Sequence, residues 1–295
     1  MSDCVPPALP RLQPRLRWLL FAAAALLATG CVRTASRPSA AHPPLRILTW
    51  NIHHGEGLDG RVDLDRIARL IADTEPDLVA LQEVDRGVVR TQGRNLPAEL
   101  AALTGLTAVF QHNIHFQGGE YGNATLTRWP VLSSTNHHFL MLRPGEQRGL
   151  LEVVVDIRGH PLAFWNTHID HRPDDLERWS NVGEIRDRLA ASPVPVILAG
   201  DFNDLPGSRV HQALDTFLLD VWDQVGFGPG ATFPHTRIPK RIDYIWLDRR
   251  FPLYPVSARV LDSDASDHLP LLAEVTGFPP PSLMEPGKAA SGRTR

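Results

Sequence analysis

The stretch Val196-Ile197-Leu198-Ala199-Gly200-Asp201-Phe202-Asn203-Asp204 decides the fold of this chain. An apolar run that stops at Gly-Asp-Phe-Asn predicts a buried strand whose end delivers a carboxylate and a carboxamide. Strand ends are where α/β proteins place their functional groups. In extended geometry Asp201 and Asn203 point the same way, one able to accept a proton and the other to donate to an oxyanion. A strand followed by an Asx-type turn is the alternative interpretation.

The first thirty-one residues have the composition of a signal peptide. Three arginines precede an uncharged run from Trp18 to Leu27, which is too short to span a bilayer as a stable helix. The run ends in Ala28-Thr29-Gly30-Cys31, which resembles the lipobox of bacterial lipoproteins. We therefore predict that residues 1–31 are a lipoprotein signal peptide, that Cys31 is lipidated, and that the membrane-anchored protein faces the periplasm or the exterior. An ordinary secretory signal with a coincidental cysteine is the alternative.

The remaining chain is predicted to form one domain. Residues 32–44 are rich in Ser, Pro and Ala and predict a flexible tether, residues 45–277 contain no linker, and residues 278–295 predict a disordered tail. The only two cysteines, Cys4 and Cys31, lie in the signal segment, which excludes disulfides, thiolate nucleophiles and Cys-ligated zinc in the domain. Removing residues 1–31 takes away three Arg and one Asp and changes the formal net charge from −3 to −5. We expect a monomer without a general affinity for polyanions.

Apolar strands alternate with amphipathic helices along this domain. Asp63 is predicted to cap a helix that ends at Thr74-Glu75-Pro76, and a second long helix is predicted from about Asp174 to Leu189 with Trp179 facing inward. Strands are predicted at 45–50, 77–83, 124–127, 151–155, 162–167, 196–201, 241–247 and 271–275, and short helices near 98–103 and 208–214.

Polar residues end or interrupt these strands. The set consists of carboxylates, carboxamides and imidazoles: Asn51, Glu83, His168, Asp201, Asn203, Asp243, Asp267 and His268. An oxygen-rich set of this kind suits Mg²⁺ or Mn²⁺ better than zinc. A divalent ion beside hydrogen-bond donors and one carboxylate base is what hydrolysis of a phosphate ester requires.

The order of these motifs resembles the endonuclease/exonuclease/phosphatase superfamily, which includes deoxyribonuclease I-like enzymes. The motifs are Trp-Asn-Ile at 50–52, Leu-Gln-Glu at 81–83, Asn-Thr-His at 166–168, Gly-Asp-Phe-Asn at 200–203, Arg-Ile-Asp-Tyr at 241–244 and Ser-Asp-His at 266–268. The resemblance implies a four-layer α/β sandwich, with two mixed β-sheets packed face to face and helices outside.

The resemblance also assigns roles to the site residues. It implies that Glu83 is the principal metal ligand, with Asn51 and Asp267 in or near the metal shell. It makes Asp201 the base for the attacking water, and makes Asn203, His168 and His268 donors to the phosphoryl oxygens, with Asp243 orienting His268. Further substrate contacts are expected of Asn123, which begins a strand after the glycine-rich loop 118–122, and of His171 and Arg172, which directly follow a site motif. A plain loop and hairpin is the alternative for Asn123, and solvated loop positions are the alternative for the other two.

The predicted function is metal-dependent hydrolysis of phosphate esters, foremost as a phosphodiesterase on a small or lipid-linked substrate at the cell envelope. An extracytoplasmic nuclease and a non-catalytic binding module are the alternatives. Asp85 stands where DNA-cleaving members carry a basic residue, which argues against the nuclease because a carboxylate there would face the phosphate backbone. Three nearby arginines, Arg86, Arg90 and Arg94, leave binding of nucleic acid open.

Overall fold

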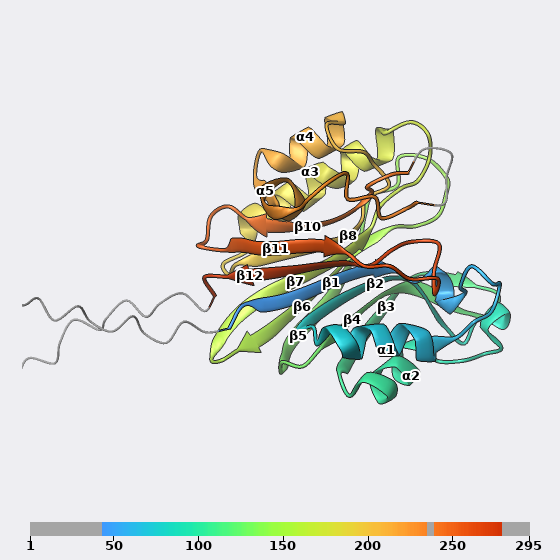
Figure 1. The fold of residues 1–295 in the computed structure, drawn as a ribbon. Helices are drawn as coiled ribbons and strands as arrows, with labels where there is room; N and C mark the ends of the chain where they lie inside the picture. Colours follow the sequence, from blue (N-terminus) through green and yellow to red (C-terminus); the bar gives the residue numbers. More distant parts are fainter. Residues whose placement is uncertain (1–42, 235–238, 279–295) are drawn as a thin grey trace, which may run out of the picture. The chain divides into compact units, whose positions relative to one another are not determined.

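Two six-stranded sheets form the centre of the domain in the computed structural model, which describes residues 43–234 and 239–278 (Figure 1). The first sheet has the order β11-β12-β1-β2-β4-β3 and the second β5-β6-β7-β8-β10-β9. In each sheet one pair is parallel, β1 with β2 and β7 with β8, and the other neighbours are antiparallel. Both sheets are therefore mixed.

The first sheet consists of β1 (Leu45–Asn51), β2 (Leu78–Arg86), β3 (Thr107–Phe116), β4 (Gly119–Thr127), β11 (Tyr254–Val260) and β12 (Leu271–Thr276). The second consists of β5 (Val131–His138), β6 (Gly149–Ile157), β7 (His160–His168), β8 (Val196–Asp201), β9 (Leu218–Asp220) and β10 (Asp243–Asp248). The helices are η2 (His53–Gly55), α1 (Leu64–Thr74), η3 (Val89–Thr91), α2 (Leu96–Thr104), α3 (Leu176–Ala191), α4 (Arg209–Asp215) and α5 (Val221–Val225).

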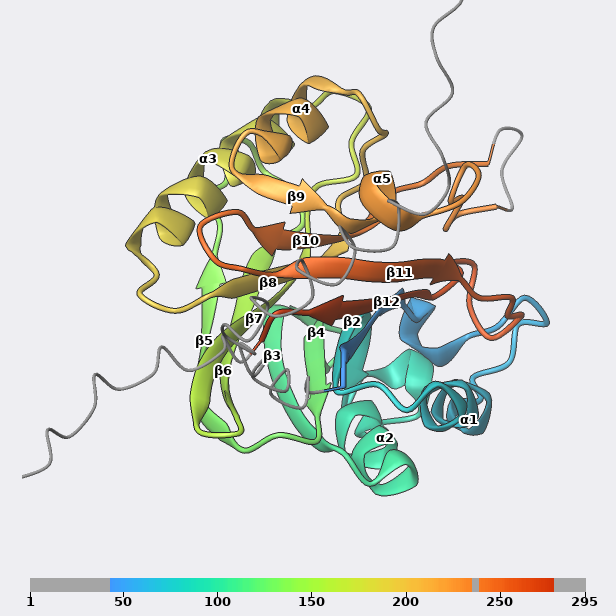
Figure 2. The ribbon, with the colours of Figure 1, turned by 60° about the vertical axis from the view of Figure 1, so that its left-hand side comes forward.

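Three apolar clusters hold the layers together. One lies between the sheets and joins residues of both, among them Ile47, Phe164 and Ile245. The other two lie between each sheet and its helices, α1 and α2 on the first sheet and α3 and α4 on the second (Figures 1 and 2). Helix, sheet, sheet, helix is the predicted four-layer sandwich, and this prediction is confirmed. None of the helices in the described part of the chain is both long and apolar enough to cross a membrane.

Local sequence accounts for the helix boundaries. The Asp63 carboxylate accepts hydrogen bonds from the backbone of Asp65 (3.0 Å) and Arg66 (3.3 Å), so the predicted N-cap of α1 is confirmed. Helix α3 begins two residues later than predicted. Trp179 is 43% exposed rather than inward, because the buried face of this helix is carried by Val182, Ile185 and Leu189 and the Trp179 ring instead stacks under the Arg209 guanidinium.

The described residues include the predicted start of the tail, at residue 278. Phe278, which the sequence placed in the tail, is only 5% exposed and packs in the cluster between the sheets. That prediction is therefore one residue short, because the sequence pattern gave no reason to bury an aromatic residue beside a run of prolines. The predicted signal peptide with Cys31, most of the tether and the rest of the tail lie outside the described residues.

Candidate active site

The site lies at one edge of the second sheet, where β7 and β8 end and the neighbouring strand β10 begins. Asp201 at the end of β8 is in register with His168 on parallel β7 and with Asp243 on antiparallel β10. All three side chains are buried. Gly200 makes this close approach feasible, because a Cβ there would collide with the carbonyl oxygen of Thr167. The glycine of the Gly-Asp-Phe-Asn motif is thus required by packing.

Asn51 joins this row to the first sheet. Its Nδ2 lies 2.9 Å from Oε1 of Glu83 and 3.1 Å from Oδ2 of Asp201, while its Oδ1 accepts from the backbone N–H of His53 at 3.1 Å. β1 packs over β8 and β10, and β2 packs over β7. The polar strand ends of the two sheets therefore meet, and Asn51 connects the carboxylate predicted to hold a metal with the carboxylate predicted to act as base.

The surroundings of Asp201 raise the pKa of its carboxyl group. Burial raises its pKa to about 7 and the neighbouring Asp243 carboxylate acts in the same direction, while His268, the backbone N–H of Asn203 and the Asn51 amide oppose the shift. A base whose pKa lies near neutral pH is well matched to proton transfer. The Asn203 N–H donates to Oδ1 of Asp201 at 2.9 Å, so the Asx-type turn of the alternative interpretation is present and shapes the base.

His268 is held by Asp243. Its Nδ1 lies 2.9 Å from Oδ2 of Asp243, which places the ring's Nε2 3.8 Å from Oδ2 of Asp201. Burial opposes the charge of the ring, but the carboxylate of Asp243, with Asp201 and Asp267, raises the pKa of His268 to about 10. At neutral pH this residue is an imidazolium that donates through Nε2.

His168 has the opposite protonation state. Burial and the adjacent Arg148 guanidinium lower its pKa well below the ordinary value. Nη1 of Arg148 lies 3.1 Å from Nδ1 of His168, and because the guanidinium is always protonated the ring must accept there and carry its proton on Nε2. That Nε2 lies 3.5 Å from Oδ2 of Asp201 and 3.0 Å from the side-chain amide of Asn203, which accepts the Nε2 proton only when its oxygen faces the ring. His168 is therefore a neutral donor directed at the Asp201 carboxylate.

Arg148 was missed by the sequence reasoning. It is 6% exposed, and its second terminal nitrogen lies 3.0 Å from Nδ1 of His171, so one guanidinium supports two imidazoles. The available indication was its position directly before strand β6, since Gly149 is in register with His168. His171 is exposed and joins the site through this contact.

Glu83 and Asp267 have the chemistry of ligands for a hard cation. Glu83 is half-buried at an irregularity of β2 and adopts the left-handed conformation (φ 60°), which directs it out of the strand pattern. Asp267 is half-buried and follows Ser266, which donates to the carbonyl of Asn51 at 2.7 Å. Two partly open carboxylates, with the Asn51 amide between Glu83 and Asp201, fit Mg²⁺ or Mn²⁺. When bound, such an ion would neutralise charge on a phosphoryl group.

The two remaining residues predicted to contact substrate, Asn123 and Arg172, have different surroundings. Asn123 is buried on β4 in a β-hairpin with β3, and its Nδ2 lies 3.5 Å from the carbonyl of Gly149. Arg172 forms ion pairs with Asp170 (2.9 Å) and Glu177 (3.2 Å), which neutralise its charge. Its role as a substrate residue has no support in this arrangement.

Asp85 does not face the site as a free charge. It is fully buried, and both of its carboxylate oxygens accept hydrogen bonds from Arg90, at 2.8 and 2.9 Å. Asp85 therefore does not present to a phosphate backbone the unpaired charge that was expected from the sequence, because Arg90 neutralises it. Its position in the sequence did not reveal this partner five residues away. Arg86 pairs with Glu120 and Arg94 with Glu99, so all three arginines of this segment are also engaged.

Comparison with known proteins decides the family. Residues 48–268 match the model of the Endonuclease/Exonuclease/phosphatase family. The chain belongs to this family. Its members are phosphoesterases and nucleases and generally depend on a divalent metal, so the chain is a hydrolase of that class.

Individual relatives differ in what is known of them. The chain is 26% identical over 244 residues to the uncharacterized protein YbhP of Escherichia coli, covering 78% of this chain and 95% of that protein. It is 24% identical over 189 residues to a 5'-tyrosyl-DNA phosphodiesterase of Caenorhabditis elegans, about half of whose length it spans (48%, against 61% of this chain). Among solved structures, an endonuclease/exonuclease/phosphatase protein of Beutenbergia cavernae is 27% identical with a TM-score of 0.64, covering 79% and 72% of the two chains. A mannosyl-6-phosphatase of Bacteroides thetaiotaomicron shares the fold at 17% identity, with a TM-score of 0.66 and coverage of 79% and 99%.

Proposed function

We propose that this family member is a Mg²⁺- or Mn²⁺-dependent phosphodiesterase that acts on a small or lipid-linked phosphate ester at the cell envelope. The proposal rests on the groups that surround the Asp201 carboxylate. A buried carboxylate whose pKa lies near neutrality is faced by a neutral imidazole, an imidazolium, the Asn51 carboxamide and the backbone N–H of Asn203. One proton acceptor among several donors suits attack of water on an anionic ester.

Each residue then has a definite task. Asp201 takes the proton of the attacking water, and its hydrogen bonds from the Asn203 N–H to Oδ1 and from the Asn51 amide to Oδ2 fix the direction of the carboxylate. His268, charged through Asp243, donates to a phosphoryl oxygen or to the leaving oxygen. His168 donates to a second phosphoryl oxygen while Arg148 keeps its proton on Nε2. Glu83 with Asp267 and Asn51 would hold the divalent ion.

Charge supports small or lipid-linked esters over duplex DNA. Binding of a duplex normally depends on several Lys or Arg contacts to phosphates. Arg86, Arg90 and Arg94 are each paired with a carboxylate, and the predicted mature chain is acidic. The predicted lipid at Cys31 would also hold the enzyme at a membrane that contains such esters. A nuclease is the second candidate, and the similarity to the tyrosyl-DNA phosphodiesterase favours it.

A substrate comparison tests the proposal. The full chain would be assayed at one Mg²⁺ concentration with an aryl phosphodiester, an aryl phosphomonoester, phospholipid vesicles and plasmid DNA. We expect turnover of the aryl or lipid diester that exceeds plasmid nicking by orders of magnitude. Efficient nicking without turnover of small or lipid esters would replace the proposal by the nuclease.

A further inference from the structure

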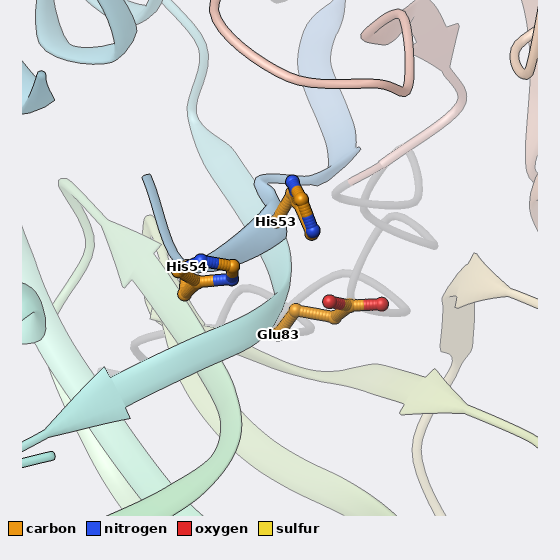
Figure 3. A group of neighbouring side chains, drawn as sticks. All are labelled: His53, His54 and Glu83. Carbon is orange, nitrogen blue, oxygen red and sulfur yellow. The ribbon is translucent and has the colours of Figure 1, made fainter. Parts of the chain in front are cut away.

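A group of side chains beside Glu83 plays no part in the mechanism above. Two consecutive histidines, His53 and His54, follow β1, and Figure 3 shows them facing Glu83 on β2. One nitrogen of each ring and one oxygen of Glu83 lie within 4.8 Å of one another. Nitrogen and oxygen atoms that share one tetrahedral ion are about 3.4 Å apart, so small side-chain rotations would bring these three to one cation.

His54 has one ring nitrogen that makes no hydrogen bond to the described residues. Its side chain is buried (6% exposed), and its Nδ1 has no hydrogen-bond partner among the described residues. The other ring nitrogen, Nε2, lies 3.4 Å from a carboxylate oxygen of Glu56. A carboxylate behind a metal-bound imidazole is the common way in which proteins orient such a ring. The unpartnered Nδ1 is therefore available as a metal ligand.

Glu83 can serve this group and the predicted magnesium site together. Its Oε1 accepts from Asn51, whereas its Oε2 accepts no hydrogen bond from any residue that the structure describes. The charge of the nearby Arg90 guanidinium is offset by Asp85, both of whose oxygens accept hydrogen bonds from it. Among the residues that the structure describes, no arginine forms an ion pair with Glu83 or Glu56, and this balance of charge favours a divalent cation.

The backbone holds the ligands in place. His53, His54 and Glu83 all adopt positive φ angles (44°, 44° and 60°), a conformation that costs energy in residues other than glycine. The segment is nevertheless fixed by backbone hydrogen bonds, from Gly55 to Ile52 (2.8 Å) and from Asp63 to Gly55 (3.0 Å). Strain that is maintained at three adjacent candidate ligands is typical of a functional site.

We propose that His53, His54 and Glu83 form a second metal site, selective for a first-row transition ion such as Zn²⁺ or Co²⁺ over Mg²⁺. Two imidazoles and one carboxylate suit such ions, whereas Mg²⁺ prefers oxygen ligands alone. Glu83 would bridge this ion and the oxygen-ligated ion. The site depends on these three side chains and not on the identity of the substrate.

Binding of Co²⁺ tests the site without an activity assay, because its visible absorption reports nitrogen ligands and coordination number. The metal-free full chain would be titrated with Co²⁺ in excess Mg²⁺, followed by His53→Gln and His54→Gln. The matched control is His137→Gln, since His137 is half-buried like His53 but lies on β5. We expect Co²⁺ to bind the wild type in the presence of Mg²⁺, and each of the two variants to weaken binding at least about tenfold while the control binds normally.

Folding of each variant would be checked by circular dichroism. If buried His54→Gln does not fold, His53→Gln decides, because its side chain is half-buried. Unchanged Co²⁺ affinity in folded His53→Gln, or full displacement of Co²⁺ by Mg²⁺ in the wild type, overturns the proposal. Co²⁺ binding that depends on His53 in a chain that hydrolyses no phosphodiester would refute the proposed function and leave this site standing.

Discussion

Replacing Asp243 by Asn separates the charge of the Asp243–His268 pair from its geometry. An asparagine has nearly the same shape, and its Oδ1 can still accept from Nδ1 of His268, where the carboxylate oxygen lies 2.9 Å away. What disappears is the negative charge that raises the pKa of His268 to about 10 against its burial. In the variant burial dominates, so the pKa of His268 falls to its ordinary value of about 6.5 or below.

The size of the effect follows from these two pKa values. With a raised folded pKa, His268 keeps its proton as the pH rises and loses it only near pH 10, so the wild type is almost fully protonated at pH 8. With a pKa of about 6.5, only about 3% of the variant carries the proton at pH 8. We therefore expect turnover of Asp243→Asn relative to wild type to fall about twenty-five-fold between pH 6 and pH 8, and about tenfold more at pH 9.

The assay is hydrolysis of an aryl phosphodiester at saturating Mg²⁺ from pH 5.5 to 9.5, reported as the ratio of variant to wild-type kcat. Asp248→Asn is the matched control, because Asp248 is a buried aspartate at the other end of the same strand, paired with Arg250. Its ratio should be independent of pH. A constant ratio for Asp243→Asn, whether near one or uniformly low, would refute an electrostatic role for Asp243.

Three further predictions concern metal, membrane and stability. Chelation should abolish hydrolysis and Mg²⁺ or Mn²⁺ restore it, and Glu83→Gln should raise the Mg²⁺ concentration at half-maximal rate; full activity in excess chelator contradicts this. Cys31→Ser should block processing or release the protein from the membrane fraction; a soluble wild type whose mature N-terminus is not residue 31 excludes the lipoprotein. Asp85→Ala leaves the Arg90 guanidinium without its buried partner and should lower the free energy of unfolding, measured in urea, by about 3 kcal/mol. Glu99→Ala breaks a more exposed ion pair and should lower it by less than about 1 kcal/mol. Equal losses in the two variants would contradict the assigned difference in burial.

The strands at the centre of each sheet could be predicted from the sequence and those at the edges could not. The four strands for which no prediction was made, β3, β5, β9 and β11, are the edge strands of the two sheets. An inner strand such as β8 is buried at every position, so its residues before Asp201 form a continuous run without polar side chains. β5 is largely exposed and reads as Ser-Ser-Thr-Asn-His-His at its centre and end, because an edge strand needs little apolar surface.

The residues of the site also differ in whether they could be predicted from the sequence. Residues at the ends of inner strands, such as Asp201, Asp243 and His168, were predicted because register brings strand ends together. The partners Arg148 and Arg90 were not, because a long side chain from a neighbouring segment finds its carboxylate or imidazole only in three dimensions. The sequence therefore predicted which polar residues gather at the strand ends better than the groups that set their charge.

The most direct test of the account is the turnover of an aryl phosphodiester by wild type and by Asp201→Asn, measured with Mg²⁺ at pH 8. An asparagine keeps the hydrogen bond from the Asn203 N–H but cannot accept the proton of water. We predict that kcat falls at least about a hundredfold while KM changes less than about threefold, because the lost interaction belongs to the transition state. A variant with wild-type kcat, or a loss confined to KM, would contradict the assignment of Asp201 as the base and with it the proposed mechanism.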